Sequence, residues 1–140
     1  MALVLKLKPG ERMIVNGAVI RNPTDRGLTI HLLNKANVLQ ARDILLPENA
    51  KSVFGLLYLE IQAILLEPET AEVHRESFVR LAASIYAQAM RKSQQETLAL
   101  ITELLQLVGE NQIYRALRKL RPAIDGELDL PVDKAIAKAR

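Results

Sequence analysis

The stretch LKLKPGERMIVNGAVIRN, residues 5–22, alternates apolar and polar side chains before a Pro-Gly pair and later reaches an Asn-Gly pair. A period of two is typical of β-strands that bury one face. Asn-Gly is a strong signal for a tight hairpin, because both residues tolerate positive φ. None of these side chains points to catalysis, so the stretch predicts a small sheet punctuated by turns.

The same period continues to residue 46. We expect four or five short strands in an antiparallel meander, separated by turn residues at Pro9-Gly10, Asn16-Gly17, Asn22–Asp25 and Asn34-Lys35. The apolar runs between these turns place the strands near Val4–Leu7, Met13–Val15, Ala18–Ile20, Leu28–Leu32 and Asn37–Gln40.

After Pro47 the period becomes helical. The first expected helix, 52–66, has a wide apolar arc and ends before Pro68. The second, 70–90, has apolar residues near one face: Val73, Phe78, Leu81, Ala82, Ile85 and Ala89. The third, 93–109, starts in the capping box Ser93–Glu96 and is stopped by Gly109, and the fourth, 111–121, ends before Pro122. The predicted fold class is therefore α+β, with a β subdomain at 1–46, a helical subdomain at 47–122 and a weakly ordered tail at 123–140.

Composition limits the classes of protein that fit. The chain has 140 residues, of which 49% are apolar, which is enough for a core. It has no cysteine, which excludes disulfides and thiolate chemistry and fits a reducing compartment. No signal-peptide pattern and no apolar run of bilayer length is present, so we expect a cytoplasmic protein that does not span a membrane.

Enzyme signatures are missing from the sequence. His31 and His74 are far apart, and we expect His31 on the outer face of a sheet and His74 on a solvated helix face. The few scattered glycines form neither a phosphate-binding loop nor a dinucleotide fingerprint. We therefore predict no catalytic site, no metal and no cofactor.

Charge is uneven along the chain. Residues 1–46 hold seven Lys/Arg against three Asp/Glu, a net charge of +4, whereas the remaining 94 residues hold 12 against 13, a net charge of −1. A basic sheet favours an anionic partner, although an imbalance of this size also arises in proteins with no such partner. The candidate phosphate contacts are Lys6, Lys8, Arg12, Arg21, Arg26, Lys35 and Arg42.

A second basic group lies on the last predicted helix, at Arg115, Arg118, Lys119 and Arg121. The first three share one face by their spacing, and two interpretations remain open. The group is either a secondary binding face or a solvated face whose cations stabilise a helix carboxyl end. All five aromatic residues lie in the helical part, so base stacking on the sheet is not expected.

Several segments together resemble the FlbT family, the flagellin synthesis regulators of alphaproteobacteria. They are Leu5–Glu11, Asn16–Ile20, Asn34–Ala36 with Val38-Leu39 and Asp43–Leu45, and Tyr114–Arg121. The order from the first strand to Arg42-Asp43-Ile44 is also similar to the carbon storage regulator, a small RNA-binding β protein. That second likeness implies RNA contacts at Arg42 and at residues 5–8.

The FlbT resemblance implies a post-transcriptional repressor that binds the 5′ untranslated leader of flagellin mRNA, limits translation and promotes decay of the transcript. The alternative is a protein-interaction module whose helices bind flagellin or a FlaF-type flagellar regulator. Affinity for RNA should fall steeply with salt, whereas a helix-face protein contact should not. A homo-oligomer is a further expectation, since a small sheet leaves exposed edges.

Overall fold

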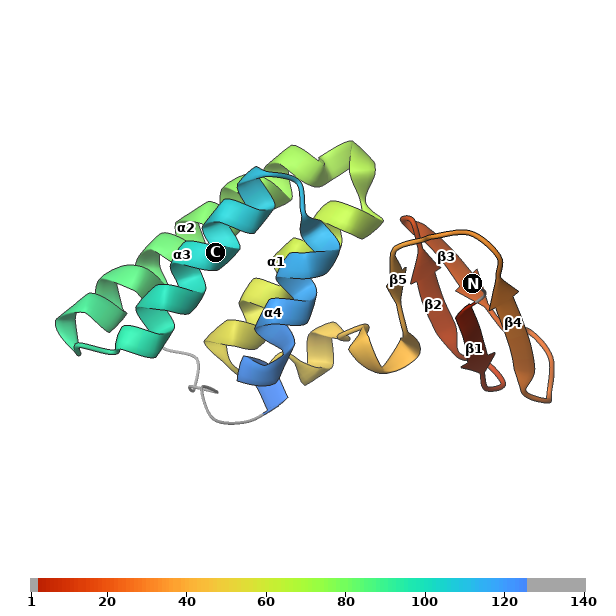
Figure 1. Ribbon diagram of the computed structural model, residues 1–140. Helices are drawn as coiled ribbons and strands as arrows, with labels where there is room; N and C mark the ends of the chain where they lie inside the picture. The colour runs from red at the N-terminus through yellow and green to blue at the C-terminus, as the bar shows by residue number, and fades with distance from the viewer. Residues whose placement is uncertain (1–2, 126–140) are drawn as a thin grey trace. The chain divides into compact units, whose positions relative to one another are not determined.

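The computed structural model describes residues 3–125, with five strands followed by four α-helices (Figure 1). The α+β fold class is thus confirmed. The chain divides into two compact units, 1–44 and 45–140, which we call the sheet unit and the helical unit.

The sheet unit contains two small antiparallel sheets. Strand β1 pairs only with β4, and β2 lies between β3 and β5. The strands are β1 (Leu3–Leu7), β2 (Arg12–Val15), β3 (Ala18–Arg21), β4 (Leu28–Leu32) and β5 (Val38–Leu39). The predicted meander is wrong, because only β2 and β3 form a hairpin between consecutive strands, while β1–β4 and β2–β5 are non-local pairs.

Apolar side chains from both sheets form one small core. Leu5 and Leu7 of β1 and Met13 of β2 are buried together, and Val15, Ile30, Leu32 and Val38 pack against them. Leu5 is directly opposite Ile30, so alternate residues of β1 and β4 face this core. Packing of β1 across Met13 explains why β1 does not continue the β2–β3 ladder.

The turns follow the predicted chemistry. Asn16 and Gly17 both have positive φ, 48° and 86°, as a two-residue hairpin of the primed type requires. Gly10 has a φ of 76° after Pro9, which turns the chain between β1 and β2. Gly10 and Gly17 sit in a region that side chains with a Cβ rarely adopt.

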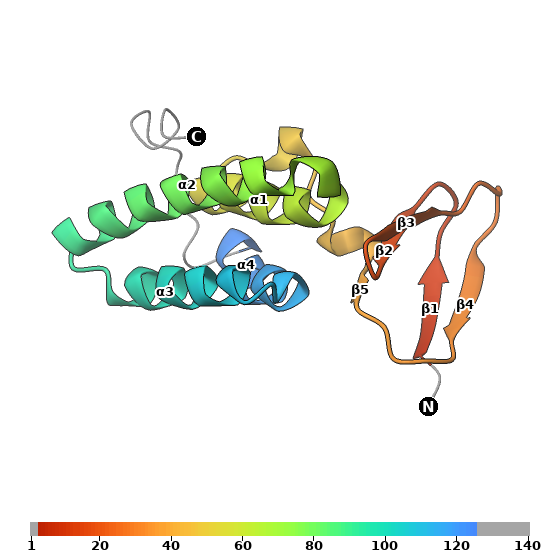
Figure 2. The ribbon, with the colours of Figure 1, turned by 90° about the horizontal axis from the view of Figure 1, so that it is seen from above.

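The helical unit is built from α1 (Val53–Leu66), α2 (Ala71–Arg91), α3 (Gln95–Gly109) and α4 (Ile113–Asp125). Short 3₁₀ turns lie at η1 (Ala41–Asp43), η2 (Pro47–Asn49) and η3 (Pro68–Thr70). Helix α1 packs against α2 and α4, and α3 packs against the same two helices. The result is two layers, α1 with α2 and α3 with α4 (Figure 2).

Helix α1 is buried as predicted. The Ser52 hydroxyl caps its amino end by accepting from the Gly55 N–H at 3.1 Å. Phe54, Leu57 and Ile61 are completely buried. The side-chain amide of Gln62 donates to and accepts from the backbone of Leu45, both at 2.9 Å, which fixes the segment leading into the helix.

Four helix predictions need correction. Ser93 has a φ of 55° and lies in the turn, so α3 starts after Gln94 without a capping box. The left-handed residue after α3 is Asn111, with a φ of 59°, whereas Gly109 is the last helical residue. Helix α4 runs past Pro122 to Asp125, and Val73 is 60% exposed instead of facing the core.

Candidate nucleic-acid interface

All seven basic residues predicted to bind RNA are exposed on the sheet unit. None of them forms an ion pair with another residue of the described range 3–125. The unit has three carboxylates, Glu11, Asp25 and Asp43. Glu11 is used locally, because its Oε1 accepts from the backbone N–H of Lys8 at 2.8 Å.

The solvent-facing side of β1 and β4 carries Lys6. Its cross-strand partner is Thr29, and Val4 is opposite His31. All four side chains are exposed, which confirms that His31 lies on the outer face. This face offers one cation beside a hydroxyl and an imidazole, groups that hydrogen-bond to phosphates or base edges.

Arg12 and Arg21 are directly opposite each other at one end of the β2–β3 hairpin. Two like charges in this position lower the stability of a sheet. No carboxylate in the described part of the chain pairs with either guanidinium. An anion that binds both guanidinium groups offsets their repulsion and stabilises the arrangement.

Asn22 organises the residues around this pair. Its side chain is completely buried and makes four hydrogen bonds. Nδ2 donates to the carbonyls of Leu7 and Arg26 at 3.0 and 2.8 Å, and Oδ1 accepts from the N–H and the hydroxyl of Thr24 at 2.9 and 2.6 Å. The backbone of Asn22 also bonds to Gly10 and Glu11 at 2.9 and 3.0 Å.

These bonds gather four of the predicted cations at one end of the sheet unit. Lys8 follows Leu7, Arg21 precedes Asn22 and faces Arg12, and the Arg26 carbonyl is itself an Asn22 partner. We call Lys8, Arg12, Arg21 and Arg26 the Asn22 cluster. From the sequence Asn22 is expected only as a turn residue, although Asn-Pro-Thr-Asp is a sequence in which an Asn side chain can bond to the backbone of its own turn.

The other two loop cations lie elsewhere. Lys35 follows the far end of β4, near the Asn16 turn, where the Asn37 N–H donates to Asn16 Oδ1 at 2.9 Å. Arg42 is on η1, which follows β5 and contacts β2. Because β5 runs antiparallel to β2, η1 returns along β2 toward Arg12.

The sheet unit has no aromatic residue, since Phe54, Tyr58, Phe78, Tyr86 and Tyr114 all belong to the helical unit. Base stacking on Phe, Tyr or Trp rings is therefore excluded for this surface. Cations, hydroxyls, His31 and backbone groups are what the unit offers to a ligand.

The basic residues of α4 separate into two sets. Arg115, Arg118 and Lys119 are exposed on one face, and Lys119 Nζ is 3.2 Å from Glu103 Oε2. Arg121 is on another side of the helix, with its guanidinium carbon 5.6 Å from the centre of the Tyr58 ring. The predicted secondary basic face thus consists of three residues, one of them ion-paired.

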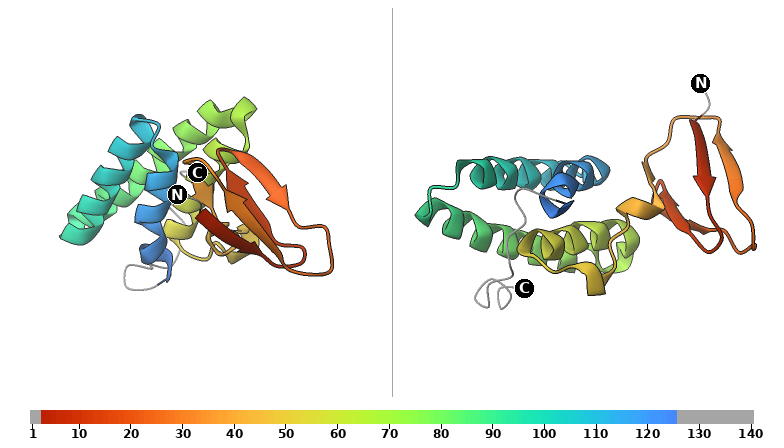
Figure 3. Two further views of the ribbon diagram at one scale, coloured as in Figure 1. Left: turned by 45° about the vertical axis from the view of Figure 1, so that its right-hand side comes forward. Right: turned by 90° about the horizontal axis from the view of Figure 1, so that it is seen from below.

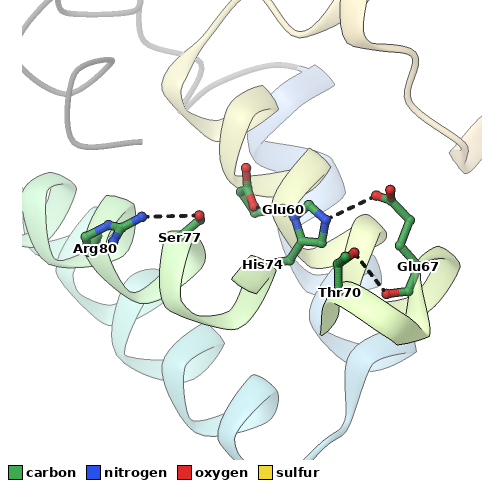
Figure 4. Close-up of polar contacts among 6 residues, drawn as sticks. All are labelled: Glu60, Glu67, Thr70, His74, Ser77 and Arg80. Atoms are coloured by element: carbon green, nitrogen blue, oxygen red, sulfur yellow. Dashed lines mark hydrogen bonds and ion pairs between the residues drawn. The ribbon is translucent and has the colours of Figure 1, made fainter. Parts of the chain in front are cut away.

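His74 does not sit on a solvated face as predicted. Its Nδ1 is 3.0 Å from Glu60 Oε2 and its Nε2 is 3.2 Å from Glu67 Oε2 (Figure 4). Both ring nitrogens therefore lie within hydrogen-bond distance of a carboxylate oxygen. His74 therefore links α2 to α1 and to the residue that follows α1. The nearby Glu72 and Glu76, each two residues away in the sequence, did not indicate this structural role.

Residues 3–125 contain neither a metal-ligating cluster nor a membrane-spanning helix. No group of three His, Asp or Glu side chains there is placed to hold a metal ion. No helix in that range is long and apolar enough to cross a bilayer.

Comparison with known proteins identifies related sequences. The family model described as "Flagellar protein FlbT" matches residues 3–130. The protein named "Probable flagellum biosynthesis repressor protein FlbT" of Mesorhizobium japonicum is 32% identical over 136 residues, which covers 92% of this chain and 89% of that protein.

Proteins with the same name in Brucella anthropi and Brucella ovis are each 31% identical over 129 residues, covering 92% of this chain and 82% of theirs. No solved structure matches the chain.

Proposed function

The chain belongs to the FlbT family of flagellar proteins, and we propose that it represses flagellin synthesis by binding the 5′ untranslated leader of flagellin mRNA. The membership makes it a flagellar regulator. Direct binding of RNA, the leader as the target, and the cytoplasm as the place of action are the parts that we propose.

The observation that supports this proposal best is the Asn22 cluster. Four exposed cations belong to backbone segments that meet at one end of the sheet unit, and two of them, Arg12 and Arg21, are directly opposite each other on adjacent strands. In the helical unit, by contrast, Arg75, Lys119 and Arg121 have carboxylate partners. Cations held together without internal partners favour a polyanionic ligand.

The proposed mechanism is occupancy. The Asn22 cluster neutralises phosphates, and the outer face with Lys6, Thr29 and His31 contacts the adjoining nucleotides. Bound protein then blocks ribosome access, and the untranslated transcript is exposed to decay. No covalent step by this chain is required.

Binding of the purified full-length chain to a labelled flagellin leader tests the proposal. An unrelated RNA of equal length is the control, and both are measured at two salt concentrations. We expect tighter binding to the leader and an affinity that falls steeply with salt. Equal affinity for both RNAs would mean that the protein binds RNA without preference for the leader, which would refute the proposed target. An absence of binding by folded protein would refute the proposal as a whole.

Single substitutions locate the surface. Lys8→Ala should weaken leader binding several-fold and reduce the slope of log K against log salt by about 0.7, because one phosphate contact is lost. Arg42→Ala should do the same if η1 belongs to the interface. Lys51→Ala is the matched control, since Lys51 is an exposed cation of the helical unit outside every predicted site. An equal effect of all three would contradict the site.

A second candidate function is a protein-interaction module for flagellin or a FlaF-type regulator. The exposed apolar residues of the sheet unit favour it, notably Leu33, which is 77% exposed, and Val19, which is 55% exposed. Such a contact would be far less sensitive to salt than RNA binding. Substitution of Leu33 by Ser would then impair regulation while RNA affinity stays unchanged.

A further inference from the structure

Helix α2 carries an exposed apolar stripe on one face. Val79, Ala83, Tyr86 and Met90 follow one another at steps of four, three and four residues, and all four are exposed. This spacing places them on a single narrow face of a helix. Val79 is 51%, Tyr86 37% and Met90 57% exposed, although each has a large apolar side chain.

The same face of α2 is hollowed nearer its amino end. A shallow depression of about 500 Å³ is lined by Glu72, Arg75, Glu76, Val79 and Arg80. Val79 belongs to both features, so the depression and the stripe form one continuous strip along the helix. Its two ends differ, with a depression at one end and the projecting side chains of Tyr86 and Met90 at the other.

We propose that this strip is the dimer interface of the protein and that its occupant is α2 of a second copy, packed antiparallel about a two-fold axis beside Ala83. In that arrangement Val79 of one copy meets Tyr86 of the other. Met90 of the second copy enters the depression beside Glu76, and the reciprocal contact forms at the other end. The small Ala83 at the crossing lets the helices approach at the usual 8–10 Å.

Charge supports a second copy as the occupant. Glu72 and Glu76 lie near the amino end of α2, and Arg91 and Lys92 lie at its carboxyl end. Antiparallel pairing places Glu76 of each copy beside Arg91 of the other, on the same side of the strip. Within residues 3–125 neither of these two residues has an ion-pair partner. In a dimer with this two-fold axis, the apolar side chains of each copy are covered by those of the other, and Glu76 and Arg91 form ion pairs. Each copy uses the same surface, as in any isologous interface.

Access to the strip is open at its carboxyl end. The carboxyl end of α2 and the amino end of α3 extend beyond α1 and α4 (Figures 2 and 3), so this end of the helical unit is built from two helices only. Helix α2, with 21 residues, is about 30 Å long. A contact made by one such helix from each copy is small beside the extensive interfaces of obligate dimers. The dimer should therefore be reversible. This proposal does not depend on RNA binding.

The absence of cysteine from the chain gives a direct test. Ala83→Cys in the full-length protein places one thiol next to the two-fold axis. Ala99→Cys, at an exposed alanine on α3, is the matched control. Under mild oxidation we expect disulfide-linked dimer to form at least about tenfold faster with Ala83→Cys, because the proposed axis brings the two thiols together. Equal rates would overturn the proposal.

A charge-exchange pair tests the contact itself. Glu76→Arg should weaken the dimer about tenfold or more in sedimentation equilibrium, because it opposes Arg91 of the second copy. Glu76→Arg combined with Arg91→Glu should restore dimerisation to near the original affinity, while far-UV circular dichroism verifies the fold of each variant. A wild-type protein that stays monomeric up to about 100 times the concentration used for RNA binding would refute the interface, and so would an unrescued double variant.

Discussion

The two units differ in how their cations are partnered. In the helical unit three cations are held by other groups: Lys119 reaches Glu103, Arg121 lies over Tyr58 and next to Asp125, and Arg75 bonds to the Val108 carbonyl and to Asn111. In the sheet unit the seven cations have no carboxylate partner among the described residues. These three cations of the helical unit therefore help to hold its helices together, whereas all seven of the sheet unit are available to a ligand.

The difference also concerns what holds each unit together. The helical unit has a large apolar core, from Phe54 on α1 to Leu117 on α4. The sheet unit has a few apolar residues around Leu7 and Met13, and it depends on a buried polar side chain, Asn22. Units this small are marginally stable, so single polar contacts have large effects there.

The largest effect is expected from Asn22→Ala. The substitution removes four hydrogen bonds and leaves the buried carbonyl of Leu7 without its partner, at a cost of about 3 kcal/mol. Amide hydrogen exchange of residues 3–40 should accelerate strongly, while tyrosine fluorescence, which reports only on the helical unit, stays the same. RNA affinity should also decrease, because the proposed binding surface belongs to the destabilised sheet unit.

Asn34→Ala is the control for this loss, because Asn34 is an exposed loop residue of the same unit. It should leave exchange close to the wild-type rate. Similar acceleration in both variants would mean that Asn22 is an ordinary turn residue and that the contrast between the two units is overstated.

A smaller effect is expected in the helical unit from His74→Ala. The substitution removes the group that joins the buried Glu60 of α1 to α2, and we expect a loss of about 2 kcal/mol in the free energy of unfolding. Urea unfolding followed by circular dichroism measures it. RNA affinity should not change, which would sharpen the contrast between a stabilising unit and a binding unit.

The sequence predicted the features that arise from local periodicity. The positions of the five strands, the Asn16-Gly17 hairpin and the burial of α1 all follow from residue order within short windows. The pairing of β1 with β4 is set by packing between distant residues such as Leu5 and Ile30, which no local window contains. The strand positions were therefore predicted correctly, whereas the predicted pairing of consecutive strands in a meander is wrong.

The candidate site was predictable in composition but not in arrangement. The seven cations are evident from the uneven charge along the chain, but no local pattern groups Lys8 and Arg26 around Asn22 or separates Lys35 from them. His74 was misplaced for the same reason, since Glu60 and Glu67 come from the preceding helix and its end. Helix α4 continues through Pro122 to Asp125, with Ala123 buried, although proline locally disfavours a helix interior.

The smallest stability effect, and the most specific, is expected from Arg21→Thr. Threonine is favoured in strands, and the substitution removes the like charge opposite Arg12. The free energy of unfolding of the sheet unit should therefore increase by about 0.5 kcal/mol. The same substitution removes a phosphate contact and should weaken leader RNA binding several-fold. Hydrogen exchange of β2 and β3 measures the first change, and RNA titration measures the second.

Opposite signs for stability and affinity would identify Arg21 as a residue retained for binding at the expense of the fold. Lys51→Thr is the comparison, because Lys51 is an exposed cation of the helical unit outside every predicted site. There the substitution should leave both the stability of the helical unit and the RNA affinity close to those of the wild type. If Arg21→Thr lowered stability instead, the repulsion between Arg12 and Arg21 would be too well screened to mark the site.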